Sequence, residues 1–174
     1  AAHWATDGFS YSFDLPDADH LYRLTVDYPD DDRRTMGFWI NDGAVSNDGG
    51  IILTGGVETG DRYRLTNRMQ THRAFFRPVN EKGLVVAVIN LTEGCRAAAA
   101  RIRIDRIDSP LPAGPAGRAG GRTFGNYFEE SGRWLRHFGA KRGEGLGQHL
   151  ATMERWGEWN RFMGVNLMFP TINV

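Results

Sequence analysis

The sequence contains very few of the residues that make covalent or metal cross-links. Cys95 is the one cysteine in 174 residues, which rules out an intrachain disulfide and a zinc site built on several thiolates. No run of about 18 apolar residues occurs, so a membrane-spanning helix is not expected. Residues 1–6 lack the charged and apolar regions of a signal peptide. Because such a peptide is cleaved, the sequence leaves secretion open.

Lysine is also scarce, since the 21 basic residues include only Lys82 and Lys141. Acidic residues number 21 as well, so the net charge is zero. Residues 1–112 carry 16 acids and 13 bases, and residues 113–174 carry 5 acids and 8 bases. Neither region is basic enough to indicate a nucleic-acid partner, and no membrane partner is expected. The arginine bias serves bidentate contacts or, more simply, reflects genomic base composition.

A segment rich in proline and glycine divides the chain. Residues 110–121 contain three prolines and four glycines, a composition that continues neither a strand nor a helix. We therefore expect a β-sandwich module over residues 1–109, a linker over residues 110–122 and a second region over residues 123–174.

Before the linker, apolar residues alternate with polar ones, which is typical of strands with one buried and one wet face. The clearest strands are 9–15, 22–28, 36–41 and 100–105, together with 84–89, which is apolar on both faces. Weaker candidates are 50–54, 61–66 and 71–79. About eight short strands separated by turn signals predict a mainly β fold, an antiparallel β-sandwich. Its predicted core is Tyr22, Leu24, Val26, Phe38, Ile40, Val85, Ala87, Ile89, Ile102 and Ile104.

After the linker, apolar residues follow a helical period. A first helix is predicted to end at Gly139, with Asn126 and Glu129 as a capping box at its start. A second helix carries apolar residues from Leu146 to Met163 and is followed by Gly164 as its C-terminal cap. The apolar run 165–172 is predicted to be a short strand. The second region is thus expected to contain two helices and a strand.

Four segments of the first region together resemble galactose-binding-like jelly-roll modules, which bind carbohydrate and accompany many bacterial glycoside hydrolases. The segments are residues 22–30, 36–41, 85–90 and 99–107. The resemblance covers about residues 7–109 and rests on strand order and turn placement. It implies an accessory carbohydrate-binding module of a multidomain hydrolase, with carbohydrate as its partner, no cofactor apart from a Ca²⁺ ion considered below, and a secreted or periplasmic location.

Residues 154–166, Glu-Arg-Trp-Gly-Glu-Trp-Asn-Arg-Phe-Met-Gly-Val-Asn, resemble the opening of a glycoside-hydrolase-type (β/α)₈ barrel. In such barrels a helix ends in glycine, an asparagine follows and a barrel strand begins. A complete barrel needs about 250 residues, so residues 123–174 are expected to be the truncated start of a catalytic barrel. The resemblance then implies that the catalytic carboxylates, which lie on later strands, are absent. The chain itself is expected to be non-catalytic, and its parent protein a glycoside hydrolase.

Trp39 is the candidate sugar-binding aromatic. Because Met36, Phe38 and Ile40 share the predicted core face, Trp39 points outward, where a rigid indole stacks on the apolar face of a sugar ring. The following loop offers amide and carboxylate groups that pair with sugar hydroxyls, namely Asn41, Asp42, Asn47 and Asp48. The alternatives are an indole covered by a loop or by the C-terminal helices, and an ordinary hairpin loop.

The loop that contains Asp30, Asp31 and Asp32 is a candidate Ca²⁺ site, because this ion takes oxygen ligands. Three adjacent carboxylates do not match the spaced ligands of an EF-hand loop. The simpler alternative is a turn in which Arg33 and Arg34 neutralise the acids.

Arginines recur on two neighbouring predicted strands, at positions 62, 64, 73 and 77. If they share one face, they form a cationic surface that suits acidic sugars. A solvated face paired with nearby acids is the alternative.

Three functions are left open: an accessory carbohydrate-binding module, a purely structural β-sandwich that packs on a catalytic domain, and a small complete glycoside-acting enzyme. An open outer sheet face around Trp39 favours the first, and covering of that face by residues 123–163 favours the second. The third requires two carboxylates in one cleft.

Overall fold

The computed structural model describes residues 7–18, 20–43, 51–109, 111, 125–128, 138, 140, 143, 145–165 and 167–170. The chain divides into two compact units, Ala1–Ile107 (unit 1) and Asp108–Val174 (unit 2). The described part is mainly β, with two antiparallel sheets in unit 1 and one helix in unit 2. Within this part, no helix is both long and apolar enough to cross a membrane.

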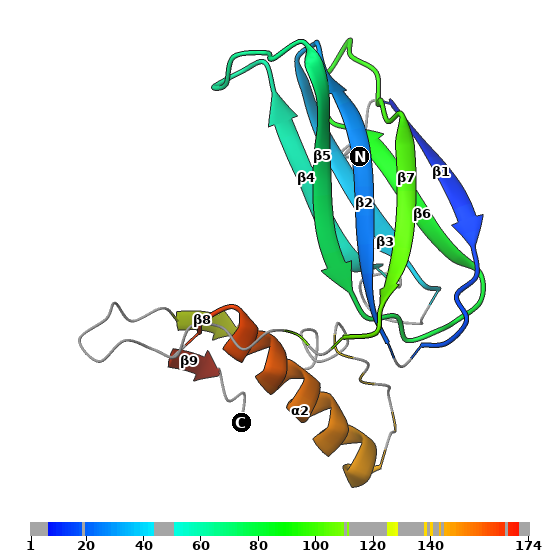
Figure 1. Ribbon diagram of the computed structural model, residues 1–174, viewed down its shortest axis with the longest axis vertical. Helices are drawn as coiled ribbons and strands as arrows, with labels where there is room; N and C mark the ends of the chain where they lie inside the picture. The colour runs from blue at the N-terminus through cyan, green and yellow to red at the C-terminus, as the bar shows by residue number, and fades with distance from the viewer. Residues whose placement is uncertain are drawn as a thin grey trace. The chain divides into compact units, whose positions relative to one another are not determined.

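Unit 1 contains two antiparallel sheets, drawn in Figure 1. Sheet A has the strand order β1-β6-β3-β4, and sheet B has the order β5-β2-β7. The strands of sheet A are β1 (Asp7–Phe13), β6 (Leu84–Asn90), β3 (Arg34–Asn41) and β4 (Ile51–Thr59). Those of sheet B are β5 (Arg68–Phe76), β2 (Leu21–Asp30) and β7 (Arg101–Ile107).

One hydrophobic core joins the two sheets. Leu24 and Val26 of β2 and Phe38 of β3 are all fully buried in it. The Phe38 ring centroid lies 6.2 Å from that of Tyr28 and 5.1 Å from that of His72, so one ring of sheet A meets two of sheet B. The alternation predicted for β2 and β3 is confirmed, because every second residue of each strand faces this core.

The predicted phase of β6 is wrong. The residues expected in the core, Val85, Ala87 and Ile89, are half-buried on the outer face of sheet A, and Leu84, Val86 and Val88 are the buried ones. A strand that is apolar on both faces gives no alternation from which the inner face can be read. Ile102 and Ile104 pack against the core but are only half-buried.

The weak strand candidate at residues 61–66 is a loop, so the described part of unit 1 has seven strands. The Asp30 carboxylate accepts hydrogen bonds from the Thr66 backbone N–H at 2.9 Å and from its hydroxyl at 2.7 Å. Asn67 follows with a positive φ of 54°. The side chain of Asp30 thus fixes a turn in a segment whose alternation resembled a strand.

Unit 2 contains a parallel strand pair and a helix. β8 (Gly125–Phe128) pairs with β9 (Leu167–Pro170), and α2 (Leu146–Phe162) lies between them in sequence. The predicted helix start at Asn126 is therefore wrong, because this residue lies within β8. Aromatic residues at 124, 127 and 128 match helical spacing by coincidence, since a four-residue strand is too short to show its own period.

The predicted C-terminal cap of α2 is confirmed. Gly164 adopts φ +72°, and the Val165 N–H donates to the Asn160 carbonyl at 2.9 Å. A left-handed glycine with this backward hydrogen bond is the Schellman ending of a helix. Beside it, the Trp159 ring centroid lies 6.4 Å from Phe138 and 5.6 Å from Phe162.

Val26→Asp tests the shared core. Val26 is 0% exposed, so an aspartate there would carry an unpaired charge into an apolar interior, at a cost of several kcal/mol. We expect unit 1 to unfold or to lose most of its stability in urea titration. Ser10→Asp, at an exposed position of β1, should change the unfolding free energy by less than about 0.5 kcal/mol. Equal stability of the two variants would contradict the core assignment.

His72 makes the stability of unit 1 depend on pH. Its ring lies on the inner side of β5, opposite Val26, and its buried Nε2 has no hydrogen-bond partner among the described residues. Burial lowers the pKa of His72 from its ordinary 6.5. The unfolded chain therefore binds more protons than the folded chain as the pH falls through 6.5.

The unfolding free energy should consequently fall as the pH drops from 7 to 5, by at most about 1.4 kcal/mol per pH unit from this one group. Above pH 7 the contribution of His72 is constant. His72→Leu should reduce the slope between pH 7 and 5 in urea titrations. An unchanged slope would show that the buried imidazole does not control it.

Candidate functional site

The candidate functional site is a groove along one edge of unit 1. Sheet A has four strands and sheet B three, so the inner face of β1 extends beyond β7 (Figure 1). Phe9, Tyr11 and Phe13 lie on this inner face, because they pair with the core-facing Val88, Val86 and Leu84 of β6. Tyr11 is nevertheless 60% exposed. The face that these aromatic side chains share is thus left partly uncovered.

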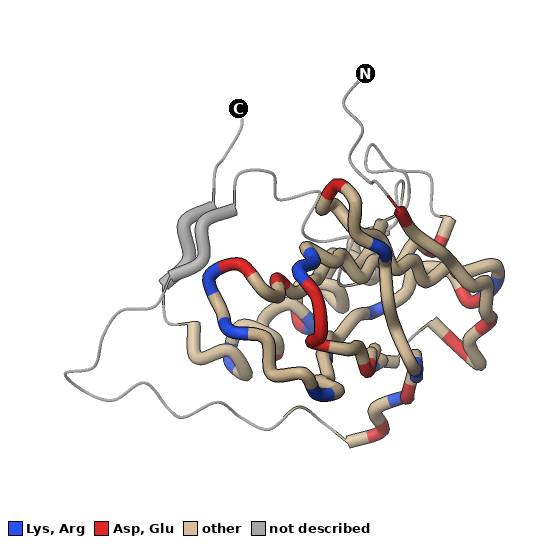
Figure 2. The backbone as a smooth tube through the Cα atoms, turned by 90° about the horizontal axis from the view of Figure 1, so that it is seen from above, with Lys and Arg blue, Asp and Glu red and all other residues tan. Residues whose placement is uncertain are grey.

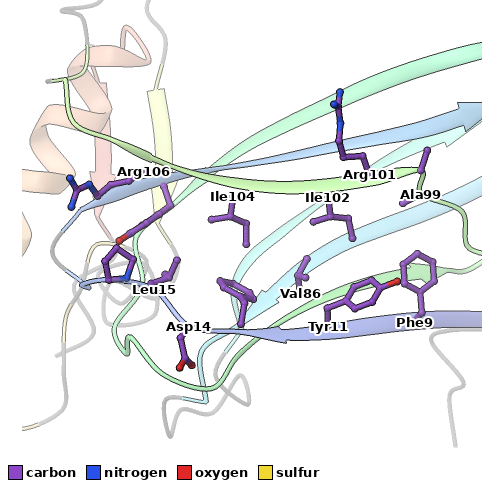
Figure 3. Close-up of a pocket in the computed structure, with 14 residues that line it drawn as sticks. Phe9, Tyr11, Asp14, Leu15, Val86, Ala99, Arg101, Ile102, Ile104 and Arg106 are labelled. Atoms are coloured by element: carbon purple, nitrogen blue, oxygen red, sulfur yellow. The ribbon is translucent and has the colours of Figure 1, made fainter.

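The groove encloses about 710 Å³ between β1 and β7. Figure 3 shows the rings of Phe9 and Tyr11 on one side and Ile102 and Ile104 on the other. Tyr22 also lines the groove; its hydroxyl donates to the Asp17 carbonyl at 2.8 Å, and its ring stacks on Phe76 at 5.7 Å. The lining is therefore apolar and largely aromatic, and its volume lies within the range of small-molecule sites, about 300–1,000 Å³.

Charged groups stand at the margin of the groove. Arg106 contacts the Asp17 carboxylate at 3.3 Å, and the other oxygen of that carboxylate contacts His20 Nδ1 at 2.5 Å. Hydrogen bonding to His20 lowers the pKa of Asp17 from its usual value. Asp14 accepts a hydrogen bond from the Gly83 N–H at 2.9 Å, which lowers the pKa of Asp14. Both carboxylates therefore stay ionised throughout the neutral range.

Among the described residues, the lining of the groove contains a single carboxylate, that of Asp14. Retaining and inverting glycosidases both act with two carboxyl groups across the scissile bond. The described lining therefore holds one of the two carboxyl groups that such a mechanism uses.

Trp39 stands on the outer face of sheet A, where it is half-buried. Its cross-strand neighbours are Thr54 of β4 and Ala87 of β6. The indole nitrogen lies 2.9 Å from the point where a Cβ on Gly37 would be, so the ring edge covers that glycine. Only a residue without a side chain fits beneath it.

The polar residues predicted around Trp39 take different positions. Asp42 is 1% exposed, and its Oδ2 accepts hydrogen bonds from the N–H groups of Val79 at 2.8 Å and Asn80 at 3.3 Å. Asn41 accepts a hydrogen bond from the Gly43 N–H at 2.7 Å. A carboxylate placed like that of Asp42 holds a neighbouring loop instead of facing solvent. Asn47 and Asp48 lie outside the described residues.

The aspartates predicted to bind Ca²⁺ are engaged with other partners. Asp30 binds Thr66, as described above, and Asp31 contacts Arg34 at 2.6 Å. Arg34 is itself buried, and it also donates to the carbonyl oxygens of Pro29 and Arg96. Within the described ranges, no group of three or more His, Cys, Asp or Glu side chains is placed to hold a metal ion.

Sequence patterns predicted the inward face of Phe9, Tyr11 and Phe13 but not the groove. The alternation over residues 9–15 shows which side chains share a face. It does not show how many strands the opposite sheet has, and this number decides whether the face is covered. The predicted cationic grouping is also different in the structure, because Arg62 and Arg64 lie in a loop and Arg73 lies in β5.

No protein-family model matches the chain, and no curated protein matches it. Among solved structures, the chain is similar to a family GH115 4-O-methyl-α-glucuronidase with specificity for decorated arabinogalactans. The TM-score is 0.41 and the sequence identity 9%, and the match covers 58% of this chain and 13% of that enzyme. A likeness at this level carries no argument about what the chain binds. The described residues define a mainly β protein with an open, aromatic-lined groove.

Asp42→Ala should separate a structural role from a binding role. Removing the acceptor leaves the buried Val79 N–H unpaired, which costs about 1–3 kcal/mol of unfolding free energy. Asp61→Ala, at an exposed loop position, should cost less than about 0.5 kcal/mol. Urea titration measures both. A loss of sugar binding without a loss of stability in Asp42→Ala would identify this side chain as a ligand contact.

Proposed function

We propose that unit 1 is a carbohydrate-binding module and that the groove between β1 and β7 is its binding site. The supporting observation is the partly uncovered row of rings, Phe9, Tyr11 and Phe13, that faces Ile102 and Ile104 across about 710 Å³. Aromatic rings stack on the apolar faces of sugars, and charged groups at the margin hydrogen-bond hydroxyls. Arg106 and Asp14 line the groove and supply such groups, and Asp17 contacts Arg106.

The chain path supports the finer proposal of a jelly-roll sandwich. Each connection in unit 1 passes from one sheet to the other, except the connection between β3 and β4. Jelly rolls are two-sheet folds built from Greek-key connections, which wrap the chain around both sheets in this manner. The first strand lies beside the sixth, at the edge of sheet A, as such wrapping requires.

A second candidate function is structural packing against another domain. The observation that favours it is the outer face of sheet A, where Val85, Ala87 and Ile89 of β6 and Trp39 of β3 are half-buried. Outer faces of antiparallel sheets are usually polar. An apolar outer face beside a tryptophan suits contact with a neighbouring domain, and it equally suits the sugar platform predicted at Trp39.

Unit 2 supports the proposal that the chain precedes the catalytic barrel of a multidomain glycoside hydrolase. β8, α2 and β9 form a strand, a helix and a second strand parallel to the first. This is the repeating unit of (β/α)₈ barrels, although other α/β folds share it. The parent hydrolase, and a secreted or periplasmic location for it, belong to the same proposal.

Tyr11→Ala tests the groove. Loss of one stacking ring should weaken retention on a polysaccharide affinity gel about tenfold, since a sugar–aromatic contact of about 1–1.5 kcal/mol corresponds to that factor. The matched control is Tyr63→Ala, because Tyr63 is 69% exposed in a loop and Tyr11 is 60% exposed. Neither variant should shift the melting temperature by more than a few degrees.

Trp39→Ala decides between the two sugar sites. If it abolishes retention and Tyr11→Ala does not, the ligand binds the outer face of sheet A. If neither ring matters to a panel of neutral polysaccharides, the carbohydrate proposal is wrong and the structural role becomes the better explanation.

A further inference from the structure

The outer face of sheet B carries a compact cluster of arginines. Strand register places Arg103 of β7 and Arg73 of β5 directly opposite Thr25 of β2, one on each side. The neighbouring rows add Arg23, which pairs with Asp105, and Arg101, which pairs with Asp27. We name this surface the arginine face; its members are Arg23, Thr25, Asp27, Arg73, Arg101, Arg103 and Asp105.

The arginine face is not neutralised internally. Asp105 accepts hydrogen bonds from both Arg23 and Arg103 at 3.0 Å, and Asp27 contacts Arg101 at 2.6 Å. Four arginines thus stand against two aspartates, which leaves a net charge of +2. Arg73 is exposed and forms no ion pair with a described residue. Figure 2 shows basic and acidic positions interspersed along the described backbone.

Two donors on this face have no acceptor. Thr25 is 5% exposed although it stands on the outer side of the sheet, so the side chains around it cover it. Its hydroxyl and the Nε of Arg23 are both buried without a hydrogen-bond partner among the described residues. Buried donors without acceptors carry a desolvation penalty, and the usual remedy is an acceptor oxygen. Thr25 and Arg23 are two residues apart on one strand, so their donors share one side of β2.

We propose that the arginine face binds the carboxylate groups of an acidic polysaccharide. Arg73 and Arg103 are separated by two strand spacings, about 10 Å, and each offers a planar fork that matches a carboxylate. The Thr25 hydroxyl and Arg23 Nε are covered in the free chain, so the side chains over them would turn outward onto the ligand, and a carboxylate oxygen between Arg73 and Arg103 would then accept a hydrogen bond from each. Asp27 and Asp105 would accept hydrogen bonds from sugar hydroxyls. Arg101 also lines the groove, but Thr25, Arg73 and Arg103 do not, so the proposal stands whether or not the groove binds sugar.

The composition of the face favours a uronic-acid polymer over DNA. The backbone of DNA carries a phosphate at every nucleotide and no free hydroxyl, so the two aspartates would repel it without gaining a donor. A net charge of +2 is also small for binding that depends on neutralising phosphates. Polyuronates carry hydroxyl donors beside their carboxylates, which suits a surface where aspartates lie beside arginines.

The test measures binding of the full chain to polygalacturonate by affinity electrophoresis, with fully methyl-esterified polygalacturonate as the uncharged control ligand. The wild type should bind the free acid and not the ester. Arg73→Gln/Arg103→Gln should weaken binding about tenfold or more, since two charge-assisted contacts are lost. Arg62→Gln/Arg64→Gln removes the same charge from an exposed loop and should change binding less than about twofold.

Thr25→Val tests the proposed hydrogen bond without changing the charge of the arginine face. It removes the unpaired hydroxyl at nearly constant volume, so the melting temperature should stay the same or rise. Binding to polygalacturonate should nevertheless weaken about threefold, which is a modest loss for one hydrogen bond. If Thr25→Val leaves binding unchanged, Thr25 does not contact the acid and the proposed geometry is overturned.

Other outcomes would also overturn the proposal. If Arg73→Gln/Arg103→Gln and Arg62→Gln/Arg64→Gln weaken polygalacturonate binding equally, only the total charge of the chain matters. Loss of polygalacturonate binding in Tyr11→Ala would place the acid in the groove. Single-stranded DNA that binds as tightly at the same ionic strength would identify the face as a nucleic-acid surface. Selective loss in Arg73→Gln/Arg103→Gln, with Tyr11→Ala unaffected, supports the arginine face independently of the groove.

Discussion

Sheet A carries four strands and sheet B three, and this mismatch governs the interior of unit 1. The three strands of sheet B cover most of the inner face of sheet A and bury Phe38 and Ile40 completely. The surplus strand is β1, whose inner face meets only part of β7. Burying an aromatic side chain contributes about 1.5–3 kcal/mol, and Tyr11 forgoes most of that contribution. The groove beside Tyr11 is therefore already open in the folded unit.

Local alternation predicted which residues share a face but not what covers that face. In β2 and β3 the residues that share the apolar face are also covered, because neither strand lies at the edge of its sheet. The residues predicted to be in the core are therefore buried. In β1 the shared face is not fully covered, so Phe9 and Tyr11 point inward but remain partly exposed. In β6 the pattern does not indicate which face is buried, because apolar residues occupy both faces. Strand number and strand order depend on pairings far apart in sequence, which no local pattern contains.

The roles of polar residues also could not be predicted from local sequence. In the sequence, Asp30 and Asp42 looked like ligand groups in loops, and the structure shows each accepting hydrogen bonds that hold another loop in place. Thr25 looked like an ordinary solvent-facing position between two core residues. Only the register of three strands places it between Arg73 and Arg103. The chemical meaning of a polar side chain here depends on its cross-strand neighbours and little on its sequence neighbours.

The order of the strands has a consequence for how the chain reaches its fold. Of the five strand pairings in the described part of unit 1, only that between β3 and β4 joins consecutive strands. β1 pairs with β6 alone, and Asn90 lies 83 positions after its partner Asp7 in the sequence. Proteins dominated by such distant pairings fold in milliseconds to seconds, because loop closure precedes most of the stabilising contacts. During synthesis the first strand would leave the ribosome without its partner and wait for nearly the whole of unit 1 to follow. The aromatic residues of β1 would spend that interval in water, where a chaperone or a neighbouring nascent chain competes for them.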